Sequence, residues 1–295
     1  MIIPDEKAMT DAEKLKAVRH AYARRILASV GVDDARIEQA FAEVPREDFL
    51  GPGPWPISRF GLGYVYTPSA DPAYLYTDDL VGIAPERHIN NGEPSLHAHL
   101  LWFAQPSEGE HIVHVGTGTG YYTAIMAHLA GPTGHVTGIE LESDLAARAK
   151  EYLTAYPNAE IVEGDGTIVP FEPADVIYVN AGATRPADIW LDRLNDGGRL
   201  VLPLTTDDGF SSYSSMRPRG AVFLITRKGA EFLARCVSGV AIYPCAGMRD
   251  ATSEKALARA FGNGGLKRVT RLYRTDDIPD ERCWLKGPGW CFAYE

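Results

Sequence analysis

The sequence of 295 residues predicts an α/β protein built on a doubly wound parallel sheet. Three observations support this prediction. Short β-type runs alternate with helical segments between residues 111 and 204, a glycine-rich loop joins the first run to the first helix, and a hairpin pattern follows the alternating region. Strands that alternate with helices form parallel sheets with helices on both faces. A chain of this length, with 45% hydrophobic residues, can also bury a sizeable core.

The N-terminal part is predicted to be helical. Apolar residues recur at spacings of three and four between residues 11 and 30, which is typical of an amphipathic helix. A second, shorter helix is expected from Asp34 to Phe41, with Asp33 or Asp34 as its cap. Four glycines and five prolines between residues 51 and 72 break any regular element, so we interpret this stretch as a linker or a lid.

The alternating region predicts the elements of the sheet in order. Strands are expected at residues 111–115, 135–140, 159–162, 174–180 and 199–204. Helices are expected at 119–130 and 144–155 and near 186–194. Residues 221–226 and 231–241 predict an antiparallel hairpin at the sheet edge. The last part of the chain predicts an appendage with one helix at 254–261.

Charge and cysteine content restrict the possible partners and cofactors. With 29 basic and 39 acidic residues the net charge is −10, which disfavours long nucleic acids and anionic membranes as partners. A basic cluster, Lys267, Arg268, Arg271 and Arg274, is interpreted as a solvated face, with contact to an acidic peptide or an RNA backbone as the alternative.

The four cysteines lack metal-binding spacing, so we expect no metal site and free, reduced thiols. No export signal or membrane-length apolar run is recognised, which predicts a cytoplasmic protein.

The glycine loop is the most informative motif. In VHVGTGTGYYTAIMAHLA, residues 113–130, a predicted strand runs into Gly116, Gly118 and Gly120, and a helix follows at once. Glycine is needed where the backbone turns tightly and a ligand approaches closely, and the helix N-terminus offers N–H groups to an anion. The spacing G-x-G-x-G, with Thr117 inside the loop, differs from the G-x-G-x-x-G of pyrophosphate-binding dinucleotide sites.

Two acidic residues strengthen the prediction of a nucleoside site. Glu140 ends the second strand, where a carboxylate can accept both hydroxyls of a ribose, and Asp165 with Gly166 follows the third strand, where it can accept from an adenine amine. These residues lie at the carboxyl ends of successive parallel strands, where open α/β sheets bind ligands. A nucleoside without a pyrophosphate clamp suggests S-adenosylmethionine. The alternative is that the glycines only turn the loop and the acids are solvated.

From about Val18 to Gly247 the chain resembles the protein-L-isoaspartate O-methyltransferase family, a branch of the class I S-adenosylmethionine-dependent methyltransferases. The matching stretches are VPREDF (44–49), HVGTGTGYYTAIMA (114–127), GHVTGIE (134–140), EGDGT (163–167) and GGRLVLPL (197–204). The resemblance implies a Rossmann-like sheet of seven strands with a C-terminal antiparallel strand, preceded by a helical cap. It also implies that Gly116, Thr117, Gly118, Gly120, Glu140, Asp165 and Gly166 bind the cofactor.

The substrate loop departs from the family pattern. Members carry a Thr-Ile-Ser segment before the proline that opens a helix, and alignment on Pro94 places Asn90, Asn91 and Gly92 there. We interpret these three positions as the acceptor site, with the asparagine amides orienting the acceptor; the alternative is a turn pair ahead of a helix. Gly92 stands where the family has a serine whose hydroxyl is linked to catalysis. If only this hydroxyl is missing, Gly92→Ser should raise the activity on isoaspartyl peptides. Ser95 takes a position where some relatives have a cofactor-contacting histidine.

The sequence thus predicts an O-methyltransferase that acts on a carboxylate of a protein or peptide. A carboxylate is already ionised at neutral pH and needs no general base. Another peptide, small-molecule or RNA acceptor, or a non-catalytic cofactor-binding protein, stays open as an alternative. The predicted organisation is a cap and lid loop at 1–93, a methyltransferase domain at 94–249 and an extension at 250–295.

Overall fold

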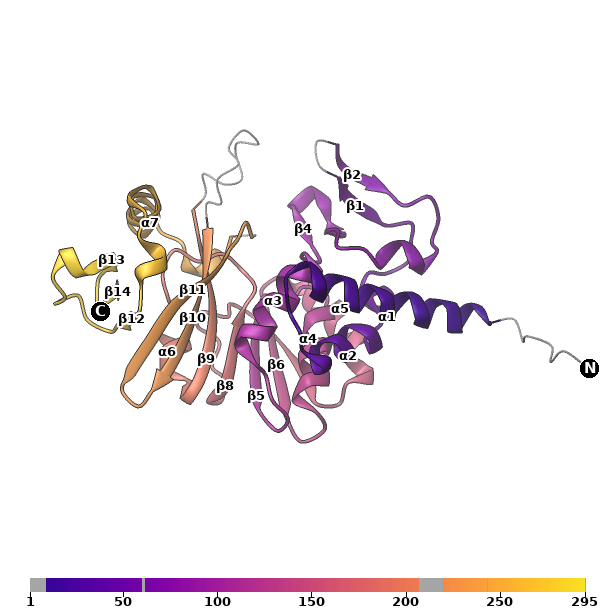
Figure 1. Ribbon diagram of the computed structural model, residues 1–295, viewed down its shortest axis with the longest axis horizontal. Helices are drawn as coiled ribbons and strands as arrows, with labels where there is room; N and C mark the ends of the chain where they lie inside the picture. The colour runs from indigo at the N-terminus through magenta and orange to yellow at the C-terminus, as the bar shows by residue number, and fades with distance from the viewer. Residues whose placement is uncertain (1–8, 60–61, 207–219, 243, 295) are drawn as a thin grey trace, which may run out of the picture. The chain divides into compact units, whose positions relative to one another are not determined.

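The computed structural model describes residues 9–59, 62–206, 220–242 and 244–294 (Figure 1). The chain divides into two compact units, one ending at His99 and the other beginning at Leu100. The division falls within helix α3 (Pro94–Ala104). The second unit also contains the described part of residues 250–295.

The first unit begins with the two expected helices, α1 (Asp11–Ser29) and α2 (Ala35–Glu43). Thr10 and Glu13 form a capping box at the start of α1, where the Thr10 hydroxyl accepts from the Glu13 N–H and the Glu13 carboxylate accepts from the Thr10 N–H. The Asp34 carboxylate caps α2 by accepting from two backbone N–H groups of its first turn. Both helices therefore start where their capping residues predict.

The stretch from 51 to 72 is more regular than its glycines and prolines predict. It contains strands β1 (Pro56–Arg59) and β2 (Gly63–Tyr66), paired as an antiparallel hairpin. The prediction of no regular element was wrong because Pro56 stands at the first position of its strand, where a proline is tolerated. The prediction of a lid is not tested by this pairing, and residues 60–61 lie outside the described part of the chain.

The remaining elements of the first unit are short. They are the 3-10 helices η1 (Arg46–Phe49), η2 (Pro72–Leu75) and η3 (Pro85–Arg87), and the antiparallel strands β3 (Gly82–Ala84) and β4 (Ile89–Asn90). A bridge between Ile57 and Val81 connects this second pair of strands to β1. Apolar residues from the connections and strands form a small core: Leu50, Trp55, Ile57, Leu75 and Val81.

The second unit is built on one sheet in which β7, β6, β5, β8 and β9 run parallel in that order. The bounds are β5 (His111–Val115), β6 (His135–Glu140), β7 (Ala159–Glu163), β8 (Ala174–Val179) and β9 (Leu194–Thr205). The helices between them are α4 (Tyr121–Ala130), α5 (Ser143–Tyr152) and α6 (Asp188–Asp192), with the 3-10 helix η4 (Leu153–Ala155) after α5. The predicted doubly wound α/β fold is confirmed.

The helices cover both faces of the sheet. The connections through α4 and α5 step from β5 toward β7, whereas the connection through α6 steps from β8 to β9, in the opposite direction. Right-handed crossovers therefore place α6 on the other face. Alternating side chains of β5 agree, because His114 bonds Thr123 of α4 while Val113 shares a core cluster with Trp190 of α6.

Antiparallel strands continue the sheet beyond β9. Strands β10 (Gly220–Lys228) and β11 (Glu231–Gly239) form the expected hairpin, in which β10 is the strand antiparallel to β9. The hairpin does not end the sheet, because the extension adds β12 (Arg271–Tyr273), β14 (Trp290–Ala293) and β13 (Cys283–Gly287). Within the described residues the sheet thus has ten strands, compared with the seven that the resemblance implies.

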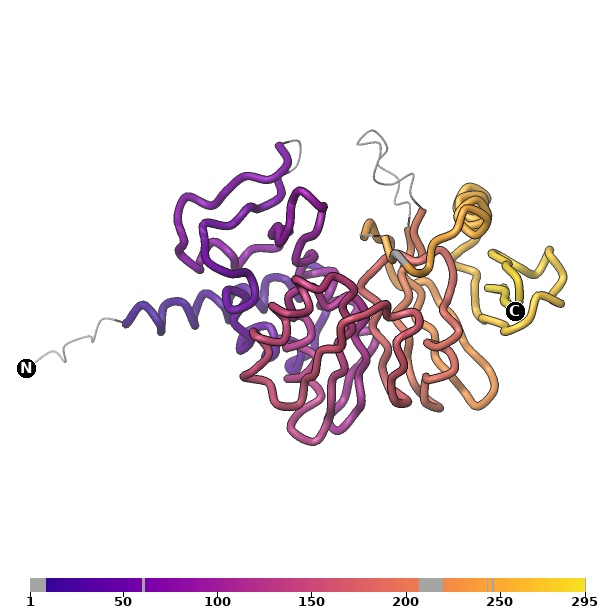
Figure 2. Tube along the Cα trace, turned by 180° about the vertical axis from the view of Figure 1, so that it is seen from behind, coloured from indigo at the N-terminus to yellow at the C-terminus, as the bar shows by residue number. Residues whose placement is uncertain are grey.

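The extension is integrated into the second unit (Figure 2). Besides its strands it contains α7 (Ala251–Asn263) and the 3-10 helices η7 (Leu266–Arg268) and η8 (Asp280–Arg282), and the 3-10 helix η6 (Ala246–Met248) precedes it. Leu257 of α7 and Trp284 and Phe292 of the added strands lie in the same core cluster as β9 and β10. The extension therefore shares the main hydrophobic core.

Much of the basic cluster in the extension is used in local pairs. Arg271 forms an ion pair of 2.8 Å with Glu231, and Arg274 pairs with Asp192 of α6. The Arg268 guanidinium lies over the ring of Tyr294 at 4.3 Å. The two ion pairs join the extension to β11 and α6, whereas the contact of Arg268 with Tyr294 lies within the extension.

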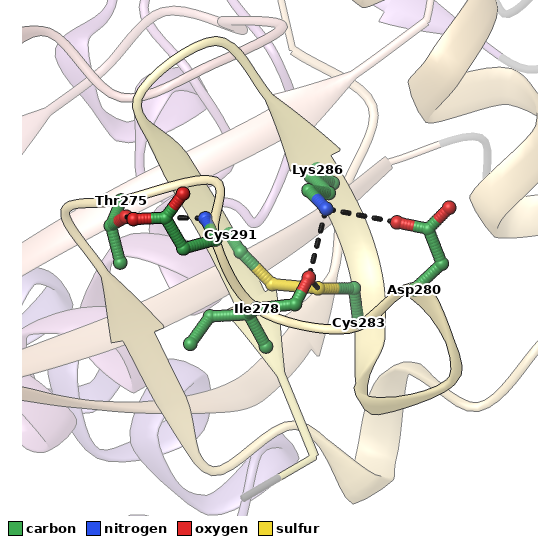
Figure 3. Close-up of a disulfide and its surroundings, with 7 residues drawn as sticks. Thr275, Ile278, Asp280, Cys283, Lys286 and Cys291 are labelled. Atoms are coloured by element: carbon green, nitrogen blue, oxygen red, sulfur yellow. Dashed lines mark hydrogen bonds and ion pairs between the residues drawn. A yellow bond between two sulfur atoms is a disulfide. The ribbon is translucent and has the colours of Figure 1, made fainter.

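The cysteines differ from the expected set of free thiols. Cys283 and Cys291 form a disulfide between β13 and β14, while Cys236 and Cys245 are free (Figure 3). The prediction failed for this pair because its spacing of eight residues carries no motif, and only the hairpin brings the two Cα atoms to 6.2 Å. Nearby, Lys286 donates to the Ile278 carbonyl and pairs with Asp280.

In the ranges that the structure describes, no helix has the length and apolar character needed to cross a bilayer.

The disulfide is expected to stabilise the extension. Replacing both partners, Cys283→Ala/Cys291→Ala, should lower the free energy of unfolding by about 2 to 3 kcal/mol, because the short closed loop restricts the unfolded chain. Urea unfolding with and without reductant measures this: reductant should destabilise the wild type and leave the double variant unchanged. Cys236→Ala serves as the control. Four reactive thiols in the denatured, unreduced wild type would contradict the disulfide.

Candidate functional site

The glycine loop connects β5 to α4 in the second unit. Gly116, Gly118 and Gly120 have φ values of +80°, +57° and +98°, in the region that strains residues with a Cβ. Space is also restricted, because a Cβ on Gly116 would lie 3.1 Å from the Asn180 carbonyl oxygen. The loop thus needs glycine for its conformation, as the motif predicts, and at Gly116 for space as well.

Glu140 lies at the end of β6 and is held against this loop. Its side chain is 6% exposed, and one carboxylate oxygen accepts from the Gly118 N–H at 2.7 Å. The other oxygen accepts from the Glu142 N–H at 3.0 Å. Burial raises the pKa of Glu140, while these backbone N–H groups act in the opposite direction. Because each carboxylate oxygen has two lone pairs, acceptor capacity remains for a ligand hydroxyl.

Asp165 and Gly166 follow β7 in a tight turn. The Asp165 Oδ1 accepts from the Thr167 N–H at 2.9 Å, which fixes the carboxylate. The Gly166 carbonyl accepts from the Trp190 indole N–H at 2.8 Å, and a Cβ on Gly166 would lie 2.5 Å from Val115. Trp190 was not identified from the sequence, since nothing in its local pattern predicts a bond to this distant turn.

Backbone hydrogen bonds hold the ends of the parallel strands together. The Gly116 N–H donates to the Ile139 carbonyl at 2.8 Å, and the Gly164 N–H donates to the Glu140 carbonyl at 2.8 Å. On the other side of β5, the Asn180 side-chain amide donates to the Gly116 carbonyl at 3.3 Å. The glycine loop, Glu140, Asp165 and Gly166 are therefore gathered at one edge of the sheet, as predicted.

The features of this edge fit a nucleoside cofactor. Glu140 offers acceptor capacity beside a loop whose glycines permit a close approach. Thr117 is buried and its hydroxyl has no hydrogen-bond partner among the described residues, so it too has unused bonding capacity. Glu140 could hold the ribose hydroxyls of the cofactor and Asp165 its adenine amine. The N-terminus of α4 carries partial positive charge and could face an anionic group of the ligand.

The predicted acceptor residues lie in the first unit, at the end of β4. The Asn90 Oδ1 accepts from the Gly92 N–H at 2.8 Å, which closes a small turn, and Gly92 has a φ of +77°. Ser95 is in the first turn of α3, where its backbone N–H donates to Asp78 at 2.7 Å. Asn90 thus ends β4, Gly92 lies in the short connection, and Ser95 lies in the first turn of α3.

Arg46, from the VPREDF stretch, organises this part of the first unit. Its side chain is fully buried, and its Nε donates to the Asn91 Oδ1 at 3.0 Å. The rest of the guanidinium donates to the carbonyls of Leu75, Thr77 and Asp79 at 2.7 to 3.1 Å. The sequence alone assigns no role to Arg46, although the VPREDF stretch that contains it is one of the matching motifs. Because arginine only donates, the Asn91 amide must present its oxygen to Arg46.

Comparison with known proteins decides the family. The family model described as protein-L-isoaspartate(D-aspartate) O-methyltransferase matches residues 25–225. The chain belongs to this family. A protein-L-isoaspartate O-methyltransferase of Ignicoccus hospitalis is 32% identical over 191 residues, which cover 63% of this chain and 82% of the relative.

Solved structures of the protein-L-isoaspartate O-methyltransferase family agree in fold. One protein-L-isoaspartate O-methyltransferase has a TM-score of 0.62 and 26% identity, covering 82% of this chain and 69% of the other. A second, from Plasmodium falciparum in complex with S-adenosyl-L-homocysteine, has a TM-score of 0.59 and 20% identity, covering 77% and 97%. The predicted family, class I methyltransferase fold and S-adenosylmethionine-dependent activity are confirmed. The roles of the individual site residues stay predictions.

The burial of Glu140 predicts a pH dependence of cofactor binding. Its raised pKa means that protonation occurs at a higher pH than for an exposed glutamate, and the protonated form loses acceptor capacity for a hydroxyl. The affinity for S-adenosylhomocysteine, measured by calorimetry, should fall as the pH drops toward this pKa. Glu140→Gln should weaken binding about 10- to 100-fold at neutral pH and remove this dependence. Glu160→Gln, which changes an exposed side chain on β7, should leave both the affinity for S-adenosylhomocysteine and its pH dependence unchanged. A pH profile retained in Glu140→Gln would exclude Glu140 as its source.

Proposed function

We propose that this chain transfers the methyl group of S-adenosylmethionine to the carboxylate of an isoaspartyl residue in a peptide or protein. The observation that carries the proposal is the family match over residues 25–225, which includes the glycine loop, both acidic residues and the substrate loop. The relatives that are about 30% identical are named protein-L-isoaspartate O-methyltransferases.

The chemistry of such a transfer makes modest demands on the protein. When bound, S-adenosylmethionine supplies a methyl group on a sulfonium, which is open to in-line displacement. An isoaspartyl carboxylate has a pKa of roughly 4, so it is ionised at neutral pH and no general base is needed. The residues of the chain then act by binding, orientation and exclusion of water, so a substrate loop without a serine hydroxyl is compatible with the reaction.

The asparagine side chains suit an anionic acceptor. The Oδ1 of Asn90 is used by the Gly92 N–H, and the Oδ1 of Asn91 is used by Arg46. Within the described residues, both amides therefore keep their NH2 groups as the available hydrogen-bond donors. Donors of this kind match a carboxylate, which only accepts. We assign Asn90, Asn91 and Gly92 to the acceptor site on this basis, and we keep Ser95 as a predicted cofactor-binding residue.

The other acceptors are less well supported. The net charge of −10 is unfavourable for RNA, and Arg271 and Arg274 of the basic cluster are engaged in ion pairs. A different peptide or small acid would use the same carboxylate chemistry, and a non-catalytic cofactor-binding role would require the same acidic residues. We place the reaction in the cytoplasm, with a protein or peptide as partner and neither membrane nor nucleic acid involved.

A methyl-transfer assay tests the proposed function. Labelled methyl from S-adenosylmethionine should appear on an isoaspartyl peptide and not on its aspartyl twin. Asp165→Ala should weaken S-adenosylhomocysteine binding about 10- to 100-fold through a lost adenine contact. If neither peptide is labelled while the cofactor binds by calorimetry, the isoaspartyl assignment fails and another acceptor or a non-catalytic role replaces it.

Gly92 allows a test of the missing serine hydroxyl. Its φ of +77° disfavours any residue with a Cβ, so Gly92→Ala and Gly92→Ser should each lower the free energy of unfolding by about 1 kcal/mol. The two variants differ mainly by the hydroxyl. Because the backbone of this turn suits glycine, we expect Gly92→Ser to methylate the isoaspartyl peptide no faster than Gly92→Ala. A clear advantage of serine over alanine would show instead that only the hydroxyl was missing.

A further inference from the structure

A segment beyond the end of the family match lies against the candidate cofactor site. The match ends at residue 225, whereas this segment comprises residues 244–249 and includes η6. The Cys245 N–H donates to the Gly182 carbonyl at 2.9 Å, and the Thr184 N–H donates to the Met248 carbonyl at 2.9 Å. These bonds fasten the segment to the chain that follows β8 at the carboxyl edge of the sheet.

Arg249 adds a second attachment on the same side. Its guanidinium donates to the Gly182 carbonyl at 2.8 Å and to the Thr205 hydroxyl at the end of β9 at 3.0 Å. It also pairs with Glu254 of α7 at 2.8 Å. The segment is therefore held at both its ends, and its position relative to the sheet edge is determined by bonds to the chain that follows β8 and to the end of β9.

Gly247, between these attachments, approaches Asp165 so closely that no side chain fits. A Cβ on Gly247 would lie 2.6 Å from the Asp165 Oδ1 and 2.6 Å from the Thr167 hydroxyl, and closer still to the Asp165 Oδ2. Gly247 is not among the glycines with positive φ, so its backbone conformation is open to other residues. Space beside the Asp165 carboxylate, rather than backbone geometry, is thus what requires glycine here.

Of the two Asp165 oxygens beside Gly247, the nearer one, Oδ2, is the one that the described residues do not use. Oδ1 accepts from the Thr167 N–H, and Oδ2 has no hydrogen-bond partner among the described residues. The neighbouring Cys245 brings no competing charge. Its thiol has a pKa raised to about 11, mainly by burial and secondly by the negative charge of Asp165. A carboxylate oxygen in this setting is available to an N–H donor of a ligand.

We propose that Gly247 is a positioning residue of the cofactor site: the lack of a side chain keeps the Asp165 carboxylate in place and leaves its Oδ2 open to the exocyclic amine of adenine. This inference rests on the proposed function, which assigns Asp165 to the adenine. It adds a residue from outside the family match to the site, and it gives the segment 244–249 the role of supporting that site.

Calorimetry with S-adenosylhomocysteine tests the inference. Gly247→Ala should weaken binding by 10-fold or more, because the added methyl group covers or displaces Oδ2. Gly262→Ala is the matched control: it adds the same methyl group in α7, where nothing lies within 4 Å, and should bind like the wild type. Equal affinities of Gly247→Ala and the wild type would overturn the inference. Failure of the wild type itself to bind would instead overturn the proposed function.

A second ligand separates positioning from general damage to the fold. S-inosylhomocysteine has an oxo group in place of the adenine amine, so the wild type should bind it at least 10-fold more weakly than S-adenosylhomocysteine. Gly247→Ala should lose most of this preference, whereas an overall structural defect would weaken both ligands equally and contradict the inference.

The variant Asp165→Ala completes the test as a double-mutant cycle. If Gly247 acts through Asp165, adding Gly247→Ala to Asp165→Ala should cause no further loss of affinity. An additive loss would show that Gly247 acts elsewhere. If Gly247→Ala fails to fold, the double variant Thr167→Ala/Gly247→Ala removes the Thr167 hydroxyl that crowds the added methyl group. Its affinities for the two ligands then provide the same comparison with the wild type.

Discussion

The parallel pairing of β5 with β6 and β8 is the constraint on which the methyltransferase unit depends. It brings the ends of the strands to one edge, where Gly116 leaves β5 and Glu140 ends β6. The bond from the Gly118 N–H to the Glu140 carboxylate then joins the loop of one strand to the end of the next. Burial raises the pKa of this carboxylate and the bond from Gly118 acts in the opposite direction, so the same contact shapes the loop and favours the charged form of Glu140.

The sequence predicted the structure best around the glycine loop, where short apolar runs and a binding motif stand side by side. The predicted limits of β5 and β6 agree with the structure, because short apolar runs and a glycine loop bound them. The hairpin of β1 and β2 was missed, since a proline at a strand start looks like a strand breaker. The disulfide between Cys283 and Cys291 was missed as well, because strand pairing, and not residue spacing, brings the two together.

The substrate loop shows why the site could be predicted only in part. The replacement of a serine by Gly92 is visible in the sequence, but the positive φ that accompanies it is not. Likewise, the bond between Arg46 and Asn91 joins residues 45 positions apart. The conformation of this loop thus depends on a glycine with positive φ and on a buried arginine from another part of the chain. Neither the φ value nor the long-range bond can be read from the local sequence.

The added strands also change where the sheet meets solvent. A hairpin that ended at β11 would leave the backbone groups of a nine-residue strand unpaired, which invites edge-to-edge aggregation. In the full sheet β12 pairs with Phe232 and Leu233 at the start of β11, and the outer strands are β13 on this side and β7 on the other, each of five residues. Both carry charge, from Glu160 and Glu163 on β7 and from Lys286 on β13, and β13 is covalently tied to its neighbour. The extension thus covers the beginning of the β11 edge and ends the sheet on a short, charged strand that is tethered to its neighbour.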